Sequence, residues 1–226
     1  MTGAVMRRSM WYIPSEFVHG TFADYAVVPR RNAIPLPKTL SPLHASILGT
    51  AWLTSYRALV TKSGIRAGET VLVQGATGGM ATALIQLGRA AGFEVWATSR
   101  SEEGRAQAKA LGAHQSFPSH EALPRRVPVV IDNVEADSWA HSMSSLARGG
   151  TTGFEVVLNL LPIVADQLTI TGSIMGTLKD MENLMRLIAE AGIEPEISVV
   201  LPMERSEEGF REMWQGRTRR KTVFTR

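Results

Sequence analysis

A turn built from small residues joins an apolar stretch to an amphipathic one within residues 71–92, which read VLVQGATGGMATALIQLGRAAG. The apolar run predicts a buried strand, and the spacing of Met80, Leu84, Leu87 and Ala91 predicts one face of a helix. Glycine lets the backbone approach a ligand closely, and the free N–H groups at the start of a helix favour an anion. The segment therefore predicts an α/β fold in which this turn binds a phosphate group.

The turn matches the G-x-G-x-x-G template for dinucleotide binding only in part. The three template positions hold Ala76, Gly78 and Ala81, so only the central glycine is kept. Its context is more specific, because the turn follows a predicted strand and opens a predicted helix. We predict that it holds a pyrophosphate, with a turn that binds no ligand as the alternative. The predicted contacts are Gly75, Ala76, Thr77, Gly78, Gly79, Met80 and Ala81.

The end of the next predicted strand bears on the choice of dinucleotide. About 20 residues beyond the turn, NAD-binding proteins carry a carboxylate that binds the ribose 2′-hydroxyl. Here the strand ends in Ser99 and Arg100, which can bind a 2′-phosphate, and Arg105 stands one helical turn further on. These residues favour NADP(H) as the cofactor. The alternative is that both arginines are solvated surface residues.

Strands and helices alternate along the rest of the chain, which predicts a Rossmann-like, doubly wound parallel sheet. We also expect residues 21–28, which alternate and are rich in β-formers, to form a strand. A helix should begin at Ser41-Pro42, and another at Ser101. The other predicted strands are 70–74, 94–98, 115–117, 127–132, 168–174, 197–201 and 222–224, and the helices are 42–62, 79–91, 102–111, 136–146, 178–191 and 204–215.

Composition excludes several classes of protein. The 24 Lys and Arg against 21 Asp and Glu leave a net charge of +3 without a block of cations, so neither nucleic acid nor a membrane surface is a predicted partner. The absence of cysteine rules out disulfides and thiolate zinc sites within this chain. The longest uncharged stretch, residues 39–56, contains Pro42 and His44 and fits a buried helix better than a membrane span. With no signal sequence recognised, we expect a cytoplasmic protein.

Several segments between residues 20 and 226 carry a family resemblance. They are GTFADYAVVP (20–29), LTSYRAL (53–59), GETVLVQGATGGMA (68–81), KALGA (109–113), VVIDNV (129–134), LTITGSIMGT (168–177) and KTVF (221–224). Together they resemble the medium-chain dehydrogenase/reductase superfamily, in its quinone oxidoreductase and zinc-binding dehydrogenase-like branch. The resemblance implies hydride transfer between NAD(P)H and a carbonyl, alcohol or activated alkene.

The resemblance also implies a domain organisation. Residues 1–44 would be the remnant of a GroES-like catalytic domain, residues 45–195 the Rossmann domain, and residues 196–226 a segment that returns to the catalytic domain. Because family members place a much longer segment before the GTFADY element, we expect most of the catalytic domain and the substrate pocket to be missing. The family's strand after Gly149-Gly150 is also not evident. Either residues 154–158 replace it or the sheet is one strand short.

Further site residues follow only from the resemblance. Thr54 would lie beside the nicotinamide, and its alternative is a helical residue that bonds its own backbone. Met175 would lie near the carboxamide, and its alternative is core filling. The residues implied to line the cofactor cleft are Thr54, Asn133, Val134, Ser173, Met175, Gly176 and Lys221.

The resemblance further bears on metal content and activity. Zinc-dependent relatives carry a ligand four residues before the position of Thr54, where this chain has Thr50, so no metal site is predicted. We expect a zinc-independent, NADPH-dependent reductase of a quinone, enone or aldehyde, with its general acid unassigned. The alternatives are a non-catalytic NADPH-binding or dimerisation module and a zinc-dependent alcohol dehydrogenase.

Residues 168–174, from Leu168 to Ile174, are expected to form an edge strand. Family members pair such a strand with its copy across a two-fold axis. An unpaired edge with Ile170 and Ile174 exposed would invite uncontrolled association. We therefore expect a homodimer, the alternative being a monomer whose edge is covered by the loop around Pro162.

Overall fold

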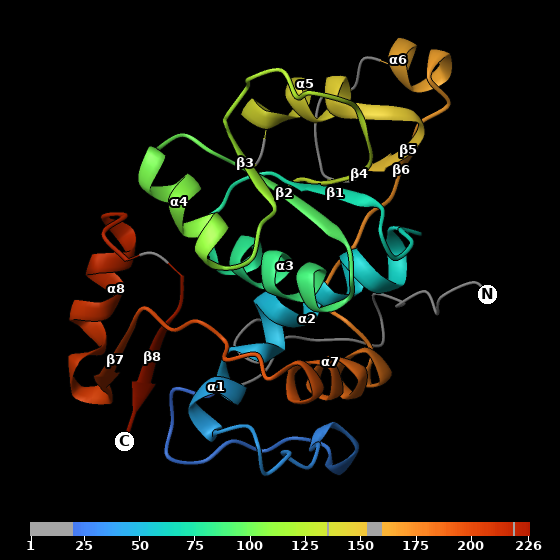
Figure 1. The fold of residues 1–226 in the computed structure, drawn as a ribbon. Helices are drawn as coiled ribbons and strands as arrows, with labels where there is room; N and C mark the ends of the chain where they lie inside the picture. The colour runs from blue at the N-terminus through green and yellow to red at the C-terminus, as the bar shows by residue number, and fades with distance from the viewer. Residues whose placement is uncertain (1–19, 135, 153–159, 219) are drawn as a thin grey trace.

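The protein contains a six-stranded parallel sheet with helices on both faces (Figure 1). The computed structural model describes residues 20–134, 136–152, 160–218 and 220–226. The strand order is β3-β2-β1-β4-β5-β6, and each neighbouring pair runs parallel. The predicted α/β fold is therefore confirmed. The strands are β1 Thr70–Val73, β2 Glu94–Ser99, β3 Gln115–Pro118, β4 Val127–Ile131, β5 Leu146–Thr152 and β6 Thr169–Ile170.

Helices connect the strands and cover the sheet. Between residues 42 and 62, the helices α1 Pro42–Ser46 and α2 Leu53–Tyr56 alternate with the π-helical turns η3 Leu48–Trp52 and η4 Arg57–Lys62. Two short 3-10 turns are η2 Arg30–Asn32 and η5 Met203–Arg205. The other helices are α3 Gly79–Ala90, α4 Glu102–Ala110, α5 Ala136–Ser145, α6 Leu160–Ala165, α7 Leu178–Ala191 and α8 Ser206–Trp214.

Side-chain caps start two helices where the sequence predicted them. The Ser41 hydroxyl accepts a hydrogen bond from the His44 N–H, and Pro42 occupies the first position of α1. The Ser101 hydroxyl likewise accepts from the Gly104 N–H at the start of α4. Each cap satisfies an N–H group that the first turn of a helix leaves unpaired, so both predicted starts are confirmed.

The side chains of β1 alternate between two cores. Val71 and Val73 belong to the larger core, which α2, α3 and α7 cover. Leu72 belongs to the smaller core with Trp96 and Leu146, against which α5 and α6 pack. Burial on both faces explains why β1 is an unbroken apolar run instead of alternating with polar residues.

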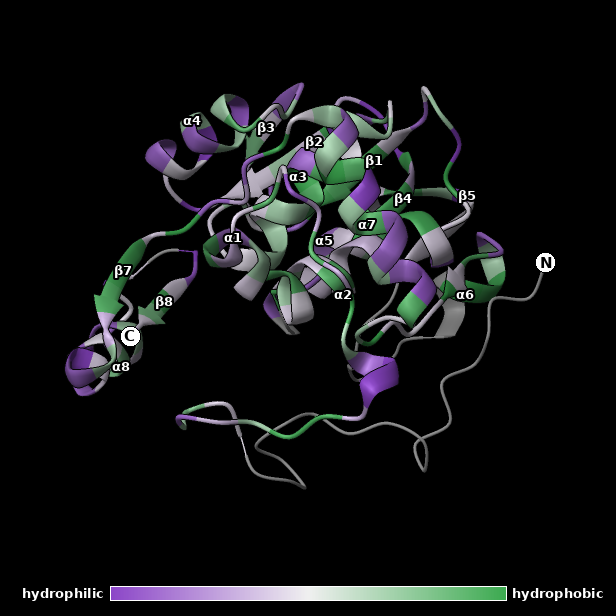
Figure 2. Ribbon diagram, turned by 90° about the horizontal axis from the view of Figure 1, so that it is seen from below, coloured by the Kyte–Doolittle hydropathy of each residue, from purple (hydrophilic) through white to green (hydrophobic). Residues whose placement is uncertain are grey.

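The C-terminal segment forms an arm beside the main sheet. The strands β7 Val199–Pro202 and β8 Thr222–Thr225 pair in parallel, and α8 packs on them. The Phe22 ring lies 5.6 Å from that of Phe210 and 5.5 Å from that of Phe224. Figure 2 shows this arm to one side of the sheet and its helices. The aromatic cluster thus joins the start of the described chain to its end.

The strand predicted over residues 21–28 is wrong. The structure has no regular element there, and Tyr25 and Val27 are 91% and 100% exposed. A strand needs a hydrogen-bonded neighbour, and no described strand runs beside these residues. Alternation in the sequence could not supply the missing partner.

The chain forms a strand through Gly149-Gly150, so the expectation of a missing strand is also wrong. The helix α5 ends at Ser145 instead of Leu146, and β5 runs from Leu146 through both glycines to Thr152. An added Cβ at Gly150 would lie 2.9 Å from the Pro128 carbonyl oxygen, and the register against β4 shifts at this point. The sheet is not one strand short, and residues 154–158 lie outside the described residues.

The predicted strand 168–174 is much shorter than expected. Only Thr169 and Ile170 form β6, and they pair with Thr151 and Thr152 of β5. Its place at the edge of the sheet is as predicted. The residues after Ile170 leave the sheet and form a loop that leads into α7.

Candidate functional site

The glycine turn lies between β1 and α3, at the carboxyl end of the strands. Gly75 has a φ of +80°, and an added Cβ there would lie 2.9 Å from Val134 Cγ2. The N-cap residue of α3 is Gly78, which has no side chain, and no described side chain forms a capping hydrogen bond there. Its first N–H groups are therefore available for an anion, and the helix dipole adds a partial positive charge.

Lys221 lies across the start of the same helix. An added Cβ at Gly79 would lie 2.9 Å from Lys221 Cε. The lysine stem therefore packs where a larger residue at Gly79 would stand. This contact brings a lysine from the C-terminal arm beside the glycine turn. The resemblance implied that Lys221 lines the cofactor cleft, but it lines none of the three cavities described below.

A first cavity of about 370 Å³, the turn cavity, opens at the glycine turn. Its walls are the turn, the end of β2, the loop after β3 and the residues that follow β4. The predicted residues that line it are Gly75, Ala76, Thr77, Gly78, Ala81, Ser99, Arg100, Asn133 and Val134. Sequence reasoning missed six other residues that line it: Gln74, Thr98, Ser119, His120, Asp137 and Ser138.

A second cavity of about 470 Å³, the polar pocket, adjoins the end of β2. Ser99, Arg100 and Ser101 form one side, and Gly216, Thr218 and Arg220 from the segment after α8 form the other. Arg220 also pairs with Glu196. Sequence reasoning missed Arg220 at this site.

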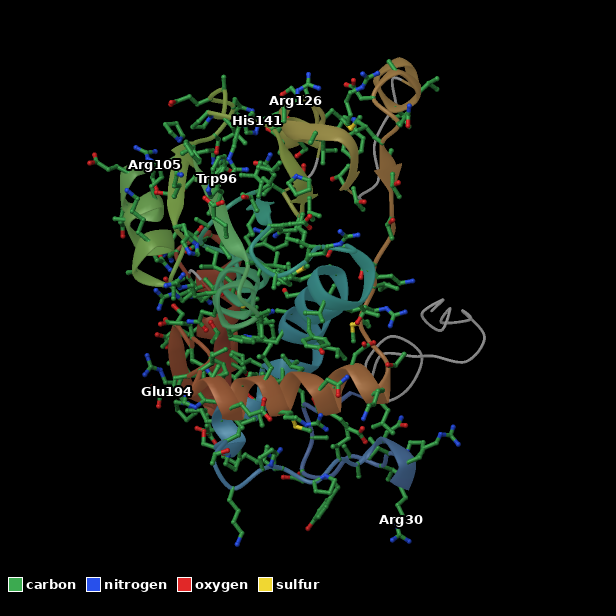
Figure 3. The ribbon with its side chains drawn as sticks, turned by 45° about the vertical axis from the view of Figure 1, so that its right-hand side comes forward. Arg30, Trp96, Arg105, Arg126, His141 and Glu194 are labelled. Carbon is green, nitrogen blue, oxygen red and sulfur yellow. The ribbon has the colours of Figure 1, made fainter. Side chains whose placement is uncertain are left out.

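Arg105 does not line the polar pocket. Its Nη1 donates to the Ser99 carbonyl oxygen at 3.2 Å, so it holds the end of β2 instead of facing the cavity. Figure 3 shows the labelled Arg105 on α4, at the outer side of the sheet. Of the two arginines predicted to contact a phosphate, only Arg100 therefore lies at the pocket.

A third cavity of about 360 Å³, the apolar cavity, lies between α2 and the ends of β4 and β5. Thr54, Asn133 and Ser173 line it, as the resemblance implied. Met80 lines it as well, so this predicted pyrophosphate contact lies not at the turn cavity but at the apolar cavity. Three buried polar atoms in its lining residues have no hydrogen-bond partner within the described parts of the chain: Asn133 Oδ1, Thr152 Oγ1 and Ser173 Oγ. Because buried polar atoms are normally paired, these three suit a ligand with its own donors.

The loop before α7 approaches the helix that carries Thr54. The Thr54 hydroxyl lies 4.0 Å from Met175 Sδ, and Met175 has a φ of +48°, which is unusual for a residue with a side chain. An added Cβ at Gly176 would lie 2.4 Å from Leu53 Cδ1. Met175 and Gly176 therefore support the wall of the apolar cavity without lining it.

A buried ion pair anchors this loop. Arg57 Nη1 lies 2.6 Å from Asp180 Oδ2, and both side chains are buried. Asp180 also accepts hydrogen bonds from Thr177 and Thr61. Burial opposes ionisation of Asp180, but the hydrogen bonds from Thr177, Thr61 and Arg57 outweigh it and hold the pKa below its ordinary value.

Tyr56 belongs to the same cluster. Burial, followed by the negative charge of Asp180, raises the pKa of its hydroxyl. Tyr56 does not line the apolar cavity. It contributes to packing between α2 and α7.

Two further observations concern metal ions and membrane-spanning helices. Across the residues whose placement is described, no group of three or more His, Cys, Asp or Glu side chains could hold a metal ion. None of the described helices is long and apolar enough to cross a membrane.

Comparison with known proteins places these features in a family. A family model described as zinc-binding dehydrogenase matches residues 79–190. The quinone oxidoreductase of Mus musculus is 29% identical over 222 residues, which cover 88% of this chain and 67% of the relative. The acryloyl-coenzyme A reductase of Sulfurisphaera tokodaii is 30% identical, over 87% of this chain and 63% of the relative. The chain spans about two thirds of the length of these relatives.

A solved structure agrees with these matches. The crystal structure of an NAD-dependent alcohol dehydrogenase matches with a TM-score of 0.86 and 30% identity, over 95% of this chain and 68% of that chain. The sheet order, the glycine turn and the cavities at the carboxyl ends of the strands fit the same fold. The chain belongs to the medium-chain dehydrogenase/reductase superfamily of oxidoreductases, in its quinone oxidoreductase-like branch.

Proposed function

We propose that this chain binds NADPH along the carboxyl edge of the sheet and uses it to reduce a quinone, an enone or an aldehyde without zinc. The polar pocket carries the proposal. Ser99, Arg100 and Arg220 converge there, and no acidic side chain of the described residues lines it. Guanidinium and hydroxyl groups favour a 2′-phosphate, whereas NAD is usually held by a carboxylate at this position.

Three features of the cavities fit a dinucleotide. The absence of a side chain at Gly75 leaves the turn open for close approach of a pyrophosphate. The first turn of α3 offers N–H groups to its negative charge. Asn133 and Ser173 offer unpaired polar atoms to a carboxamide in the apolar cavity. The adenosine half would then occupy the turn cavity.

The residues of this chain would act mainly by positioning. When bound, the reduced dinucleotide supplies a hydride for a carbonyl or an activated alkene. Val129 and Ile131 give that region apolar walls, which would keep water from the reacting groups, and Thr54 lines it as well. Positioning two reactants in this way can account for a large part of a rate enhancement.

Zinc independence and the substrate class rest on residue chemistry and on the relatives. Thr50 stands where zinc-dependent relatives carry a ligand, and the chain has no cysteine. The names of the relatives point to a quinone and to the unsaturated thioester acryloyl-coenzyme A. Both substrates are alkenes conjugated to a carbonyl group, which accept a hydride at carbon without needing a metal.

A non-catalytic NADPH-binding module is the second candidate. Turnover of NADPH with a small quinone separates the two candidates. Oxidation of the cofactor supports the reductase, and binding without oxidation supports the module.

Replacing Arg100 with Glu tests the cofactor assignment. The wild-type chain should bind NADPH more tightly than NADH, and Arg100→Glu should weaken NADPH binding about tenfold because it puts a like charge beside the 2′-phosphate. Titration followed by cofactor fluorescence measures both dissociation constants. Lys109→Glu is the matched control, because it reverses the same charge at an exposed position of α4 that lines neither the polar pocket nor the turn cavity. Equal affinities of the wild type for NADPH and NADH would refute the assignment.

A further inference from the structure

A chain of hydrogen bonds runs beneath the turn cavity and has its centre at Gln74. This side chain is only 2% exposed, at the end of β1. Gln74 Oε1 accepts from the Thr98 hydroxyl at 2.7 Å, and Gln74 Nε2 lies 2.9 Å from both Ser142 Oγ and His141 Nδ1. Asp132 extends the chain, because it accepts from the Ser142 hydroxyl at 2.6 Å. We call Gln74, Thr98, Asp132, His141 and Ser142 the Gln74 network.

The direction of each bond in the network is fixed. The single hydroxyl proton of Ser142 goes to the carboxylate of Asp132, so Ser142 can only accept from Gln74, and the amide must present its nitrogen there. His141 Nδ1 then accepts from that nitrogen. Its Nε2 carries the proton and donates to the Glu121 carbonyl oxygen at 2.7 Å. These two bonds select one tautomer of the imidazole.

The network ends at three walls of the turn cavity. The first is the glycine turn, because the Gly75 N–H donates to the Thr98 hydroxyl at 3.1 Å. The second follows β4, because the Val134 N–H donates to Asp132 Oδ1 at 3.1 Å. The third is the loop after β3, held through the carbonyl of Glu121 next to His120. His141 reaches this loop from α5, where Figure 3 labels it.

We propose that the Gln74 network is a positioning device that sets the spacing of these three walls before the cofactor binds. The inference rests on the proposed function, since the cavity it shapes is the one assigned to the adenosine half of NADPH. Buried polar networks whose members are all satisfied hold one arrangement of their partners. Fixing the walls in advance removes an ordering cost from binding. Gln74, His141 and Ser142 are thus positioning residues, and they join the end of β1 to α5, two elements far apart in the sequence.

Ser142 allows the sharpest test, because it does not line any of the three cavities. Ser142→Ala should raise the dissociation constant for NADPH about three- to tenfold, the effect of one hydrogen bond. Thr70→Val is the matched control. Both hydroxyls are buried, donate to a carboxylate at 2.6 Å and accept one bond, but Thr70 stands at the opposite end of β1. The control should lose similar thermal stability and keep its dissociation constant within about twofold.

A second pair of variants guards against a general loss of folding. Thr98→Val should weaken NADPH binding, and Thr98→Ser, which keeps the hydroxyl, should restore most of it. Equal changes in Ser142→Ala and Thr70→Val, or unchanged binding in Ser142→Ala, would overturn the inference.

A readout without cofactor separates this inference from the proposed function. Amide hydrogen exchange at Gly75 and Val134 should be faster in Ser142→Ala than in the wild type, and unchanged in Thr70→Val. If the wild type bound no dinucleotide, the proposed function would fail, and the exchange data alone would judge the network. Unchanged exchange at both amides would refute the positioning role of the Gln74 network.

Discussion

The Asp180 carboxylate holds the loop before α7 in place. It pairs with Arg57, caps α7 through Thr177 and lies below the loop that supports the apolar cavity. Its pKa is lowered in the folded state, so the unfolded chain binds its proton more readily. The stability that Asp180 contributes is complete above the ordinary carboxyl pKa of about 3.9 and is lost as pH falls through the lower folded pKa.

Asp180→Asn should therefore lower the free energy of unfolding most at neutral pH. The difference from the wild type should be constant above about pH 5 and shrink as pH falls toward 3, measured by urea denaturation. Asp166→Asn is the control, because it removes a carboxylate from surface ion pairs with Arg126 and Arg148 that solvent screens. If the difference in unfolding free energy between Asp180→Asn and the wild type stayed constant down to pH 3, the contribution assigned to the ionised Asp180 would be contradicted.

At the scale of elements, β5 depends on one glycine. Gly150→Ala would place a Cβ 2.8 Å from the Ala147 carbonyl oxygen and 2.9 Å from that of Pro128. Since backbone atoms cannot move aside easily, we expect a loss of about 1–3 kcal/mol in the free energy of unfolding. Gly49→Ala in η3 is the control: it has no neighbour within 4 Å and should be neutral or stabilising. Thermal or urea unfolding of both variants checks this, and a neutral Gly150→Ala would show that β5 adjusts.

Local pattern explains which elements could be predicted. The turn after β1 and the caps at Ser41 and Ser101 depend on neighbouring residues, so the sequence contained their signals. The strand β5 was missed because Gly149-Gly150 was taken as an end, whereas packing against Pro128 requires a glycine within the strand. Contacts between distant segments had no local signal.

The same distinction applies to the candidate site: residues with a local signal could be predicted, and residues brought in from distant segments could not. The glycine turn, Ser99 and Arg100 followed from residue types next to a predicted strand, and they lie together. Arg220 reaches the polar pocket only because the C-terminal arm returns to the end of β2. Sequence reasoning did not select Gln74, although it directly precedes the turn. Its hydrogen-bond partners His141 and Ser142 lie 67 and 68 positions away, so no local pattern indicated its role.

At the scale of the whole molecule, we propose that β6 forms the interface of a homodimer. It is the outermost strand on its side of the sheet. The Thr171 N–H donates to the Thr152 carbonyl, so the Thr169 N–H faces β5 as well, and the Ile170 N–H faces the open edge. Ile170 therefore has the donor that a second copy would use.

Ile170→Pro should weaken such a dimer, because proline removes that donor. Ile170→Val keeps the N–H group and should leave the dimer intact. Sedimentation at micromolar concentration distinguishes the two states. A wild-type species at 24.6 kDa, the mass of one chain, would rule the dimer out.

The aromatic cluster of Phe22, Phe210 and Phe224 has a consequence for the order in which the chain folds. Nearby, Arg226 pairs with Asp24, 202 positions away. Closing so large a loop costs more chain entropy than forming a strand with the helix that follows it, so we expect the sheet around β1 to form early and the arm to dock late. Until it docks, the edges of β7 and β8 and their phenylalanines stay open to other chains, and refolding should lose more protein to aggregation as its concentration rises.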